Sequence, residues 1–262
     1  MVTKDGTQRK RLPTALALTA LMVLLAGCTV PIIGGPKTTS YPRPDHLTVD
    51  MQPFIDAGCV PSEYERWTCP ADSPLAEFGC DHFGRPSDLV GGLDPALPII
   101  ECELTPFFRD GVTDPMDLVI NIDEEGFFFT EGCMAPAFFR YVVYRDGEFQ
   151  LLRSEADMRV HFAPVTSADE ALSWALAATG STPYFDPEPI RGYRYLVDEL
   201  EGTHVTETED GYRINLFHYQ LCGCGPHTTS MTEVLLSEDG HITIGEITPV
   251  YEDPEEDGLC VD

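Results

Sequence analysis

The sequence predicts an α+β fold, in which an antiparallel β-meander packs on one main helix and follows an irregular, cysteine-rich N-terminal segment. Three observations carry this prediction. Strand-like runs after residue 116 are separated by turns in which an acidic residue precedes glycine, one segment between them has helical periodicity with a cap at each end, and residues 51–115 are crowded with cysteine, proline and glycine. The chain accordingly divides into residues 1–27, 28–50, 51–115 and 116–262.

Residues 1–27 have the three parts of a signal peptide. Four basic residues come first, an apolar run covers residues 14–26, and small residues precede a cysteine. The apolar run has 13 residues, fewer than the roughly 20 that a membrane-spanning helix requires. The segment therefore predicts export of the chain that follows it.

The end of this segment reads Leu25, Ala26, Gly27 and Cys28. It resembles the lipobox of bacterial lipoproteins, in which a leucine and two small residues precede a cysteine that is lipidated and becomes the new N-terminus. The resemblance covers the first tenth of the chain and implies lipidation of Cys28 and attachment to a bacterial membrane in the cell envelope. Because Thr29 and not aspartate follows, the family's sorting habit implies the outer membrane where the envelope has two membranes. An ordinary cleaved signal with a chance Cys28 is the alternative.

Two irregular segments follow. Residues 28–50 contain proline and glycine without a periodic apolar pattern, which predicts a tether. Residues 51–115 contain four cysteines among many turn-forming residues, so we expect few and short regular elements there.

Strands dominate the predicted α+β domain of residues 116–262. Acidic-glycine turns end at Gly126, Gly147, Gly211 and Gly240, and turns of this kind join antiparallel strands into hairpins. The strands are expected at residues 118–122, 138–144, 148–152, 194–197, 204–208, 212–221, 231–236 and 241–250.

The main helix is predicted to begin after Ser167. Ser167 and Glu170 form the S-x-x-E pattern of a capping box, and Gly180 lies where a C-terminal cap belongs. Apolar residues recur between these caps at helical spacing. A shorter helix is expected from Ser154 and must end before Pro164, because the residue that precedes proline is disfavoured in a helix.

The cysteines predict four disulfide bonds. Nine cysteines without the lipidated one leave eight, an even number in an exported chain. They fall into two groups of four, so pairing within each group leaves nine connectivities. Cys222 and Cys224 are too close in sequence to pair with each other, and each is expected to pair with Cys133 or Cys260. The candidates are Cys59, Cys69, Cys80 and Cys102 in the first group and Cys133, Cys222, Cys224 and Cys260 in the second.

The alternative for the second group is a metal site. Cys222, Cys224 and His227 bring two thiolates and an imidazole within six residues, ligands that suit zinc or copper. The spacing is not that of a standard zinc ribbon, and the oxidising compartment favours disulfides, so we expect no bound metal and no other cofactor.

Other chemistry-bearing residues form no complete motif. Asn121, Asp123 and Glu125 resemble the start of a calcium loop, but position 12 is Gly132 and the flanks read as strands, which favours a hairpin turn. His204, His218 and His227 are scattered over predicted strands, where single histidines are usually structural. No catalytic acid and base can be nominated from so many carboxylates.

The composition excludes several classes of protein. The 262 residues carry 16 Lys and Arg against 44 Asp and Glu, a formal charge of −28, which excludes a nucleic-acid binder that neutralises phosphates. After residue 27 the formal charge is −31, and Lys37 is the only lysine, so Schiff-base chemistry has no residue to use. Because 43% of the residues are hydrophobic, a folded core is expected despite the acidity.

We therefore expect a lipid-anchored, disulfide-stabilised envelope protein that binds or displays something without enzymatic activity. Its expected partners are the membrane, through the anchor, and an unidentified protein or cation. The alternatives are a hydrolase that uses carboxylate or histidine side chains, and a metal-handling lipoprotein that uses Cys222, Cys224 and His227. A pocket lined by converging His, Asp or Glu would favour the hydrolase, whereas free thiols would favour the metal-handling protein.

Overall fold

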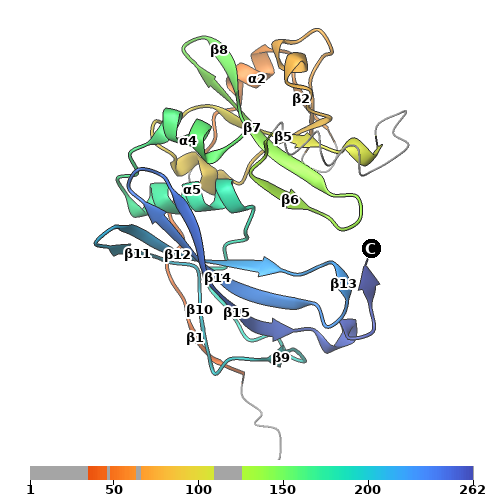
Figure 1. The fold of residues 1–262 in the computed structure, drawn as a ribbon, viewed down its shortest axis with the longest axis vertical. Coiled ribbons are helices and arrows are strands. Elements are labelled where there is room, and N and C mark those ends of the chain that lie inside the picture. The colour runs from red at the N-terminus through yellow and green to blue at the C-terminus, as the bar shows by residue number, and fades with distance from the viewer. Residues whose placement is uncertain (1–34, 46–47, 63–65, 109–125, 262) are drawn as a thin grey trace, which may run out of the picture. The chain divides into compact units, whose positions relative to one another are not determined.

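The fold is that of a computed structural model, which describes residues 35–45, 48–62, 66–108 and 126–261. The predicted signal peptide, Cys28 and the calcium-loop residues Asn121, Asp123 and Glu125 lie outside the described residues. Within them the protein mixes helices with sheets that are almost entirely antiparallel, as the sequence predicts (Figure 1).

A five-stranded antiparallel sheet forms from the C-terminal half of the chain. Its turns are the predicted ones: Gly211 has φ 136° and Gly240 has φ 82°, conformations that side chains with a Cβ rarely adopt. The strand order is β11 (Val205–Thr208), β12 (Gly211–Tyr219), β14 (Thr228–Ser237), β15 (Ile242–Glu252) and β9 (Arg194–Tyr195).

A seven-stranded antiparallel sheet forms from residues 60–152. Most of its strands before residue 105 have only two or three residues, which agrees with the expectation of short elements. They are nevertheless ordered into a sheet, because β5 pairs with β7 over six residues and so continues the sheet across the expected border at residue 115. The strands are β2 (Val60–Pro61), β3 (Arg66–Thr68), β4 (His82–Gly84), β5 (Ile99–Leu104), β7 (Ala137–Arg145) and β6 (Phe129–Glu131) in that order, with β8 (Glu148–Leu152) also paired to β7.

The helices begin and end where the predicted caps lie. Ser154 Oγ accepts a hydrogen bond from Asp157 N, and Ser167 Oγ accepts one from Glu170 N. Gly180, with φ 62°, ends the helix that begins after Ser167. A single main helix is not confirmed, since the described residues hold three α-helices: α2 (Gln52–Asp56), α4 (Glu155–Phe162) and α5 (Ala168–Thr179). Short 3-10 helices are η1 (Pro74–Phe78), η2 (Asp88–Gly92), η3 (Pro106–Phe108) and η4 (Pro254–Glu256).

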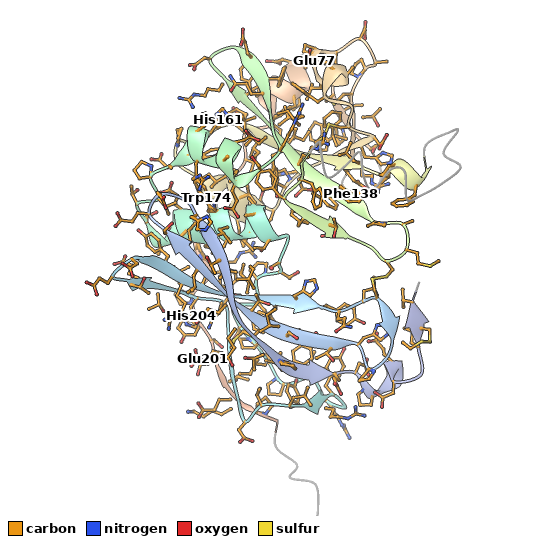
Figure 2. All side chains as sticks on the ribbon, viewed as in Figure 1. Glu77, Phe138, His161, Trp174, Glu201 and His204 are labelled. Atoms are coloured by element: carbon orange, nitrogen blue, oxygen red, sulfur yellow. A yellow bond between two sulfur atoms is a disulfide. The ribbon has the colours of Figure 1, made fainter. Side chains whose placement is uncertain are left out.

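Helix α5 connects the two sheets through one hydrophobic core. It contacts η2 as well as strands β11, β12 and β14, and Ser173 Oγ donates a hydrogen bond to the carbonyl of Leu89 at 2.5 Å. Trp174, which Figure 2 labels on this helix, is fully buried. A Cβ at Gly240 would lie 2.5 Å from the Trp174 ring, so the turn between β14 and β15 can approach the indole only with glycine at this position.

A short strand lies near the end of the predicted tether. β1 (Lys37–Thr39) pairs in parallel with β10 (Glu199–Glu201), and Lys37 Nζ lies 3.0 Å from Glu199 Oε1. Tyr41 then stacks on His204 with ring centroids 4.1 Å apart. Backbone pairing and one ring contact fix the position of these residues. Neither interaction requires apolar residues at regular spacing, so the sequence shows no periodic pattern here.

Disulfide bonds are confirmed, and all eight cysteines of the described residues take part. Each bond stays within its predicted group, and Cys222 and Cys224 bond to different partners. The bond between Cys224 and Cys260 also joins the paired strands β13 (Gly223–Cys224) and β16 (Cys260–Val261) near the C-terminus. The pairs are Cys59–Cys69, Cys80–Cys102, Cys133–Cys222 and Cys224–Cys260.

Candidate functional site

The alternative metal ligands Cys222, Cys224 and His227 do not form a thiolate site. Both sulfur atoms are held in disulfides, so neither has a thiolate to offer. His227 is 2% exposed, and its Nε2 lies 3.2 Å from the carbonyl oxygen of Leu259. Within the part of the chain that the structure describes, no group of three or more His, Cys, Asp or Glu side chains is arranged to hold a metal ion.

The three scattered histidines lie in different surroundings. Figure 2 labels His204 together with Glu201, whose carboxylate lies 3.7 Å from His204 Nε2, while Nδ1 lies 2.8 Å from the carbonyl of Gly202. His218 is exposed on β12. His227 is buried beside the C-terminal segment. These contacts do not bring the histidines into one site.

A first pocket, the glutamate pocket, lies over strands β4 to β7 and has a volume of about 500 Å³. Glu101 and Glu103 alternate with buried residues on β5, so both project from the same face of the sheet. Glu103 lies opposite His82 on β4, and its Oε1 accepts a hydrogen bond from Arg66 Nη2 at 3.0 Å. The lining consists of Arg66, His82, Glu103, Thr105, Glu131, Gly132, Ala135, Ala137 and Phe139.

Glu101 lies next to this pocket without being part of its lining. Its Oε2 is 2.7 Å from the position that a Cβ on Gly84 would occupy, so glycine on the neighbouring strand makes room for the carboxylate. Burial, with smaller contributions from Glu131 and Glu103, raises the pKa of Glu101 to about 7. A carboxyl with this pKa is partly protonated at neutral pH, which is what a general acid or base requires.

The pKa values of two neighbouring groups, Glu131 and Tyr141, are also raised. Removal from water and the charge of Glu103 raise the pKa of Glu131, while His218 opposes this effect. Burial raises the pKa of Tyr141, which is fully enclosed, and Glu101 and Glu131 add to it. Burial thus raises the pKa of Glu101, Glu131 and Tyr141 alike.

A second pocket, the tyrosine pocket, lies among β12, β14, β15 and η4 and has a volume of about 260 Å³. Tyr193 and Tyr251 have ring centroids 5.6 Å apart, and Tyr219 lies 6.2 Å from the ring of His227. Two carboxylates, those of Asp253 and Glu256, also line the pocket. The lining consists of Ile190, Tyr193, Tyr219, His227, Thr229, Tyr251, Asp253 and Glu256.

A third and larger hollow, of about 650 Å³, lies between α2 and the hairpin of β7 and β8. It includes Glu77, which Figure 2 labels, together with Asp56 and Glu148. Tyr144 and Phe149 form its aromatic side, with ring centroids 4.9 Å apart.

Among the residues that make the two smaller pockets, the sequence points to His227 and to Asp253 and Glu256, which belong to an acidic run at residues 252–257 that could collect cations weakly. A signal for the glutamate pocket was present in residues 99–104, where two glutamates alternate with residues of a buried strand. The tyrosine pocket left no such signal, because its tyrosines come from three separated segments.

Comparison with known proteins adds no assignment to these sites. No protein-family description, curated protein or solved structure matches this chain. None of the described helices is long and apolar enough to cross a membrane.

Proposed function

We propose that this protein is a lipid-anchored, disulfide-stabilised binding module of the bacterial cell envelope. Export is supported by four disulfides, because such bonds form and persist in oxidising compartments. The anchor is Cys28, at the end of the lipobox-like segment Leu25 to Cys28. Because Thr29 follows the cysteine, the anchored protein is sorted to the outer membrane in an envelope that has two membranes.

The binding role rests chiefly on the tyrosine pocket. Aromatic rings and carboxylates surround a small volume there, and a buried imidazole nitrogen of His227 has no hydrogen-bond partner. Sites that hold a small molecule combine apolar walls with a few placed polar groups in this way. Ligand binding, and not catalysis, is the chemistry that this arrangement supports.

The anchor is tested by membrane fractionation of cells that express the full-length chain. Cys28→Ser should release the mature protein from membranes, and the mass of the wild-type N-terminal peptide should include lipid. The control is the double variant Cys59→Ser/Cys69→Ser, which removes two cysteines and leaves Cys28 in place, and it should stay with the membrane. A Cys28→Ser protein that fractionates like the wild type would contradict the proposal.

A hydrolase is the second candidate, and the glutamate pocket is the observation that favours it. His82, Glu103 and Glu131 converge on this pocket, and Glu101 beside it has the raised pKa of a general acid. The binding role ranks higher because Glu101 is not part of the lining and Glu103 is engaged by Arg66.

The two candidates are separated by an assay of aryl glycosides and aryl esters between pH 5 and 8. We expect the purified protein to hydrolyse none of them above the rate in buffer. A hydrolytic rate that Glu101→Gln lowers by about 100-fold or more, the usual contribution of a general acid or base, would favour the hydrolase.

A further inference from the structure

The tyrosine pocket is assembled where three parts of the five-stranded sheet meet. Tyr251 on β15 lies opposite Thr229 on β14 and opposite Tyr195 on β9. Tyr219 ends β12, and Tyr193 precedes β9. The segment with Asp253 and Glu256 follows β15 directly, so these carboxylates line the same pocket as the tyrosines.

One tyrosine hydroxyl is bound to a carboxylate of the pocket. Tyr219 Oη donates a hydrogen bond to Glu256 Oε2 at 2.6 Å, while burial and the charges of Asp253 and Glu256 raise the pKa of Tyr193. Partial burial, followed by the bond to Glu256, raises the pKa of Tyr219 to about 12. The tyrosines therefore stay neutral at physiological pH, and their rings carry the negative faces that attract cations.

The charge inside the pocket is negative. Its lining includes two carboxylates and neither lysine nor arginine. The nearby guanidinium of Arg194 is engaged elsewhere, with Nη1 2.8 Å from Glu252 Oε2 and Nη2 2.7 Å from Asp257 Oδ2. A cation in the pocket would thus meet both aromatic faces and uncompensated carboxylates.

His227 lines the same pocket and carries a buried acceptor without a hydrogen-bond partner. Because Nε2 faces the carbonyl oxygen of Leu259 at 3.2 Å, the ring proton belongs on Nε2, and Nδ1 is left as the acceptor. Nδ1 is buried and has no partner in the structure. A buried acceptor without a partner is costly, so a ligand that reaches Nδ1 with an N–H would remove this cost.

We propose that the tyrosine pocket binds the head group of an organic ammonium ion that retains at least one N–H, that is, a protonated amine. The rings of Tyr193, Tyr219 and Tyr251 face its positive charge, Asp253 and Glu256 neutralise it, and His227 accepts its N–H. The volume of about 260 Å³ suits a small alkylammonium group and leaves the rest of a larger ligand outside. The inference names the ligand class of the proposed binding role and rests on that role.

The test compares three molecules of similar size by calorimetric titration of the full-length mature protein in detergent at neutral pH. Trimethylammonium retains one N–H, tetramethylammonium retains none, and tert-butyl alcohol has no charge. We expect trimethylammonium to bind about tenfold more tightly than tetramethylammonium, since one hydrogen bond to a charged donor is worth this much, and tert-butyl alcohol not to bind. Equal affinity for the two cations would overturn the proposal, as would displacement of trimethylammonium by glucose or by calcium.

Matched variants assign the effect to this pocket. Glu256→Gln should weaken the binding of trimethylammonium about tenfold, whereas Glu255→Gln, which changes an exposed carboxylate next to it, should leave the affinity unchanged. His227→Phe keeps an aromatic ring and should abolish the preference for the cation with an N–H. Equal weakening by both glutamate variants would indicate attraction by the acidic surface alone and would overturn the site.

A nitrogen-detected NMR measurement of the wild-type protein keeps the proposal testable if His227→Phe does not fold. The His227 Nδ1 resonance should shift when trimethylammonium is added and stay in place when tetramethylammonium is added. An unmoved Nδ1 signal at saturating trimethylammonium would overturn the assignment of His227. Failure of amine binding in a protein that Cys28 still anchors would refute this ligand class and not the anchored binding module.

Discussion

The two large sheets are stabilised by different means. In the seven-stranded sheet, β2, β3 and β4 have two or three residues each, and disulfides over 10 and 22 residues lie among them. In the five-stranded sheet, β12, β14 and β15 have 9 to 11 residues and are joined by hairpin turns or short connections. Long paired strands supply their own cross-strand contacts, whereas very short strands bury too little surface and depend on covalent bonds and on neighbouring layers.

The two pockets on these sheets differ in how their charged side chains are paired. The glutamate pocket lies on the sheet whose strands are short, and its Glu103 is paired with Arg66. The tyrosine pocket lies at the edge of the long-stranded sheet, where η4 folds back and leaves carboxylates facing aromatic rings. The lining of the glutamate pocket thus includes a guanidinium beside its carboxylates, whereas the lining of the tyrosine pocket includes neither lysine nor arginine.

The largest difference is expected between two disulfides. The bond Cys133–Cys222 closes 89 residues and joins the two sheets, whereas Cys59–Cys69 closes 10 residues within one of them. Loss of chain entropy in the unfolded state predicts that Cys133→Ala/Cys222→Ala costs about 5 kcal/mol and Cys59→Ala/Cys69→Ala about 3 kcal/mol. Urea unfolding without reductant measures both. Equal losses would show that the long loop is already restricted in the unfolded chain.

The two tryptophans test whether the core between the sheets matters more than the edge. Trp174 is fully buried on α5, where the residues around it come from both sheets, while Trp67 is partly buried on the short strand β3. Trp174→Ala should lower the free energy of unfolding by about 4 kcal/mol and Trp67→Ala by about half as much. Thermal melts followed by circular dichroism provide the values. A larger loss at Trp67 would reverse the assignment of the main core to α5.

The free energy of unfolding should depend on pH through Glu101 in the seven-stranded sheet. The pKa of Glu101 is raised from 4.5 to about 7 on folding, so the folded state binds the proton more tightly. This contribution is complete below pH 4.5 and is lost as the pH rises to about 7, a change of about 3 kcal/mol.

Glu101→Gln removes this dependence. Relative to the wild type, the variant should therefore gain stability between pH 4.5 and 7 and gain no more above that range. Chemical denaturation at a series of pH values measures the difference. The control is Glu207→Gln on the exposed face of β11, and the prediction fails if both variants follow the same curve.

The smallest losses of stability are expected at the N-terminal caps of α4 and α5, and the two losses should be equal. Ser154 and Ser167 each accept a backbone hydrogen bond in the first turn of their helix. Replacement by alanine should cost about 1 kcal/mol at either position, because one backbone donor loses its acceptor. Urea unfolding of the two single variants checks this equality. A loss several times larger at Ser167 would mean that its cap also positions α5 in the core.

Elements with local causes were predicted from the sequence. The turns at Gly147, Gly211 and Gly240 and the caps at Ser167 and Gly180 depend on residues close in the chain, and the structure has them where they were expected. The grouping of the cysteines was predicted from spacing, but the choice among the nine connectivities was not. Lipidation of Cys28 stays a prediction.

Only the tertiary structure decided where the pockets lie. Glu103 and Glu131 line one pocket because β7 pairs with both β5 and β6, and Tyr193, Tyr219 and Tyr251 line another because a sheet brings separated segments together. Parallel pairing of β1 with β10 likewise depends on residues 162 apart in the chain. Turns and caps are set by backbone conformation and hydrogen bonds within a few residues, whereas contacts between distant segments depend on how whole layers pack, which no local pattern in one sequence specifies.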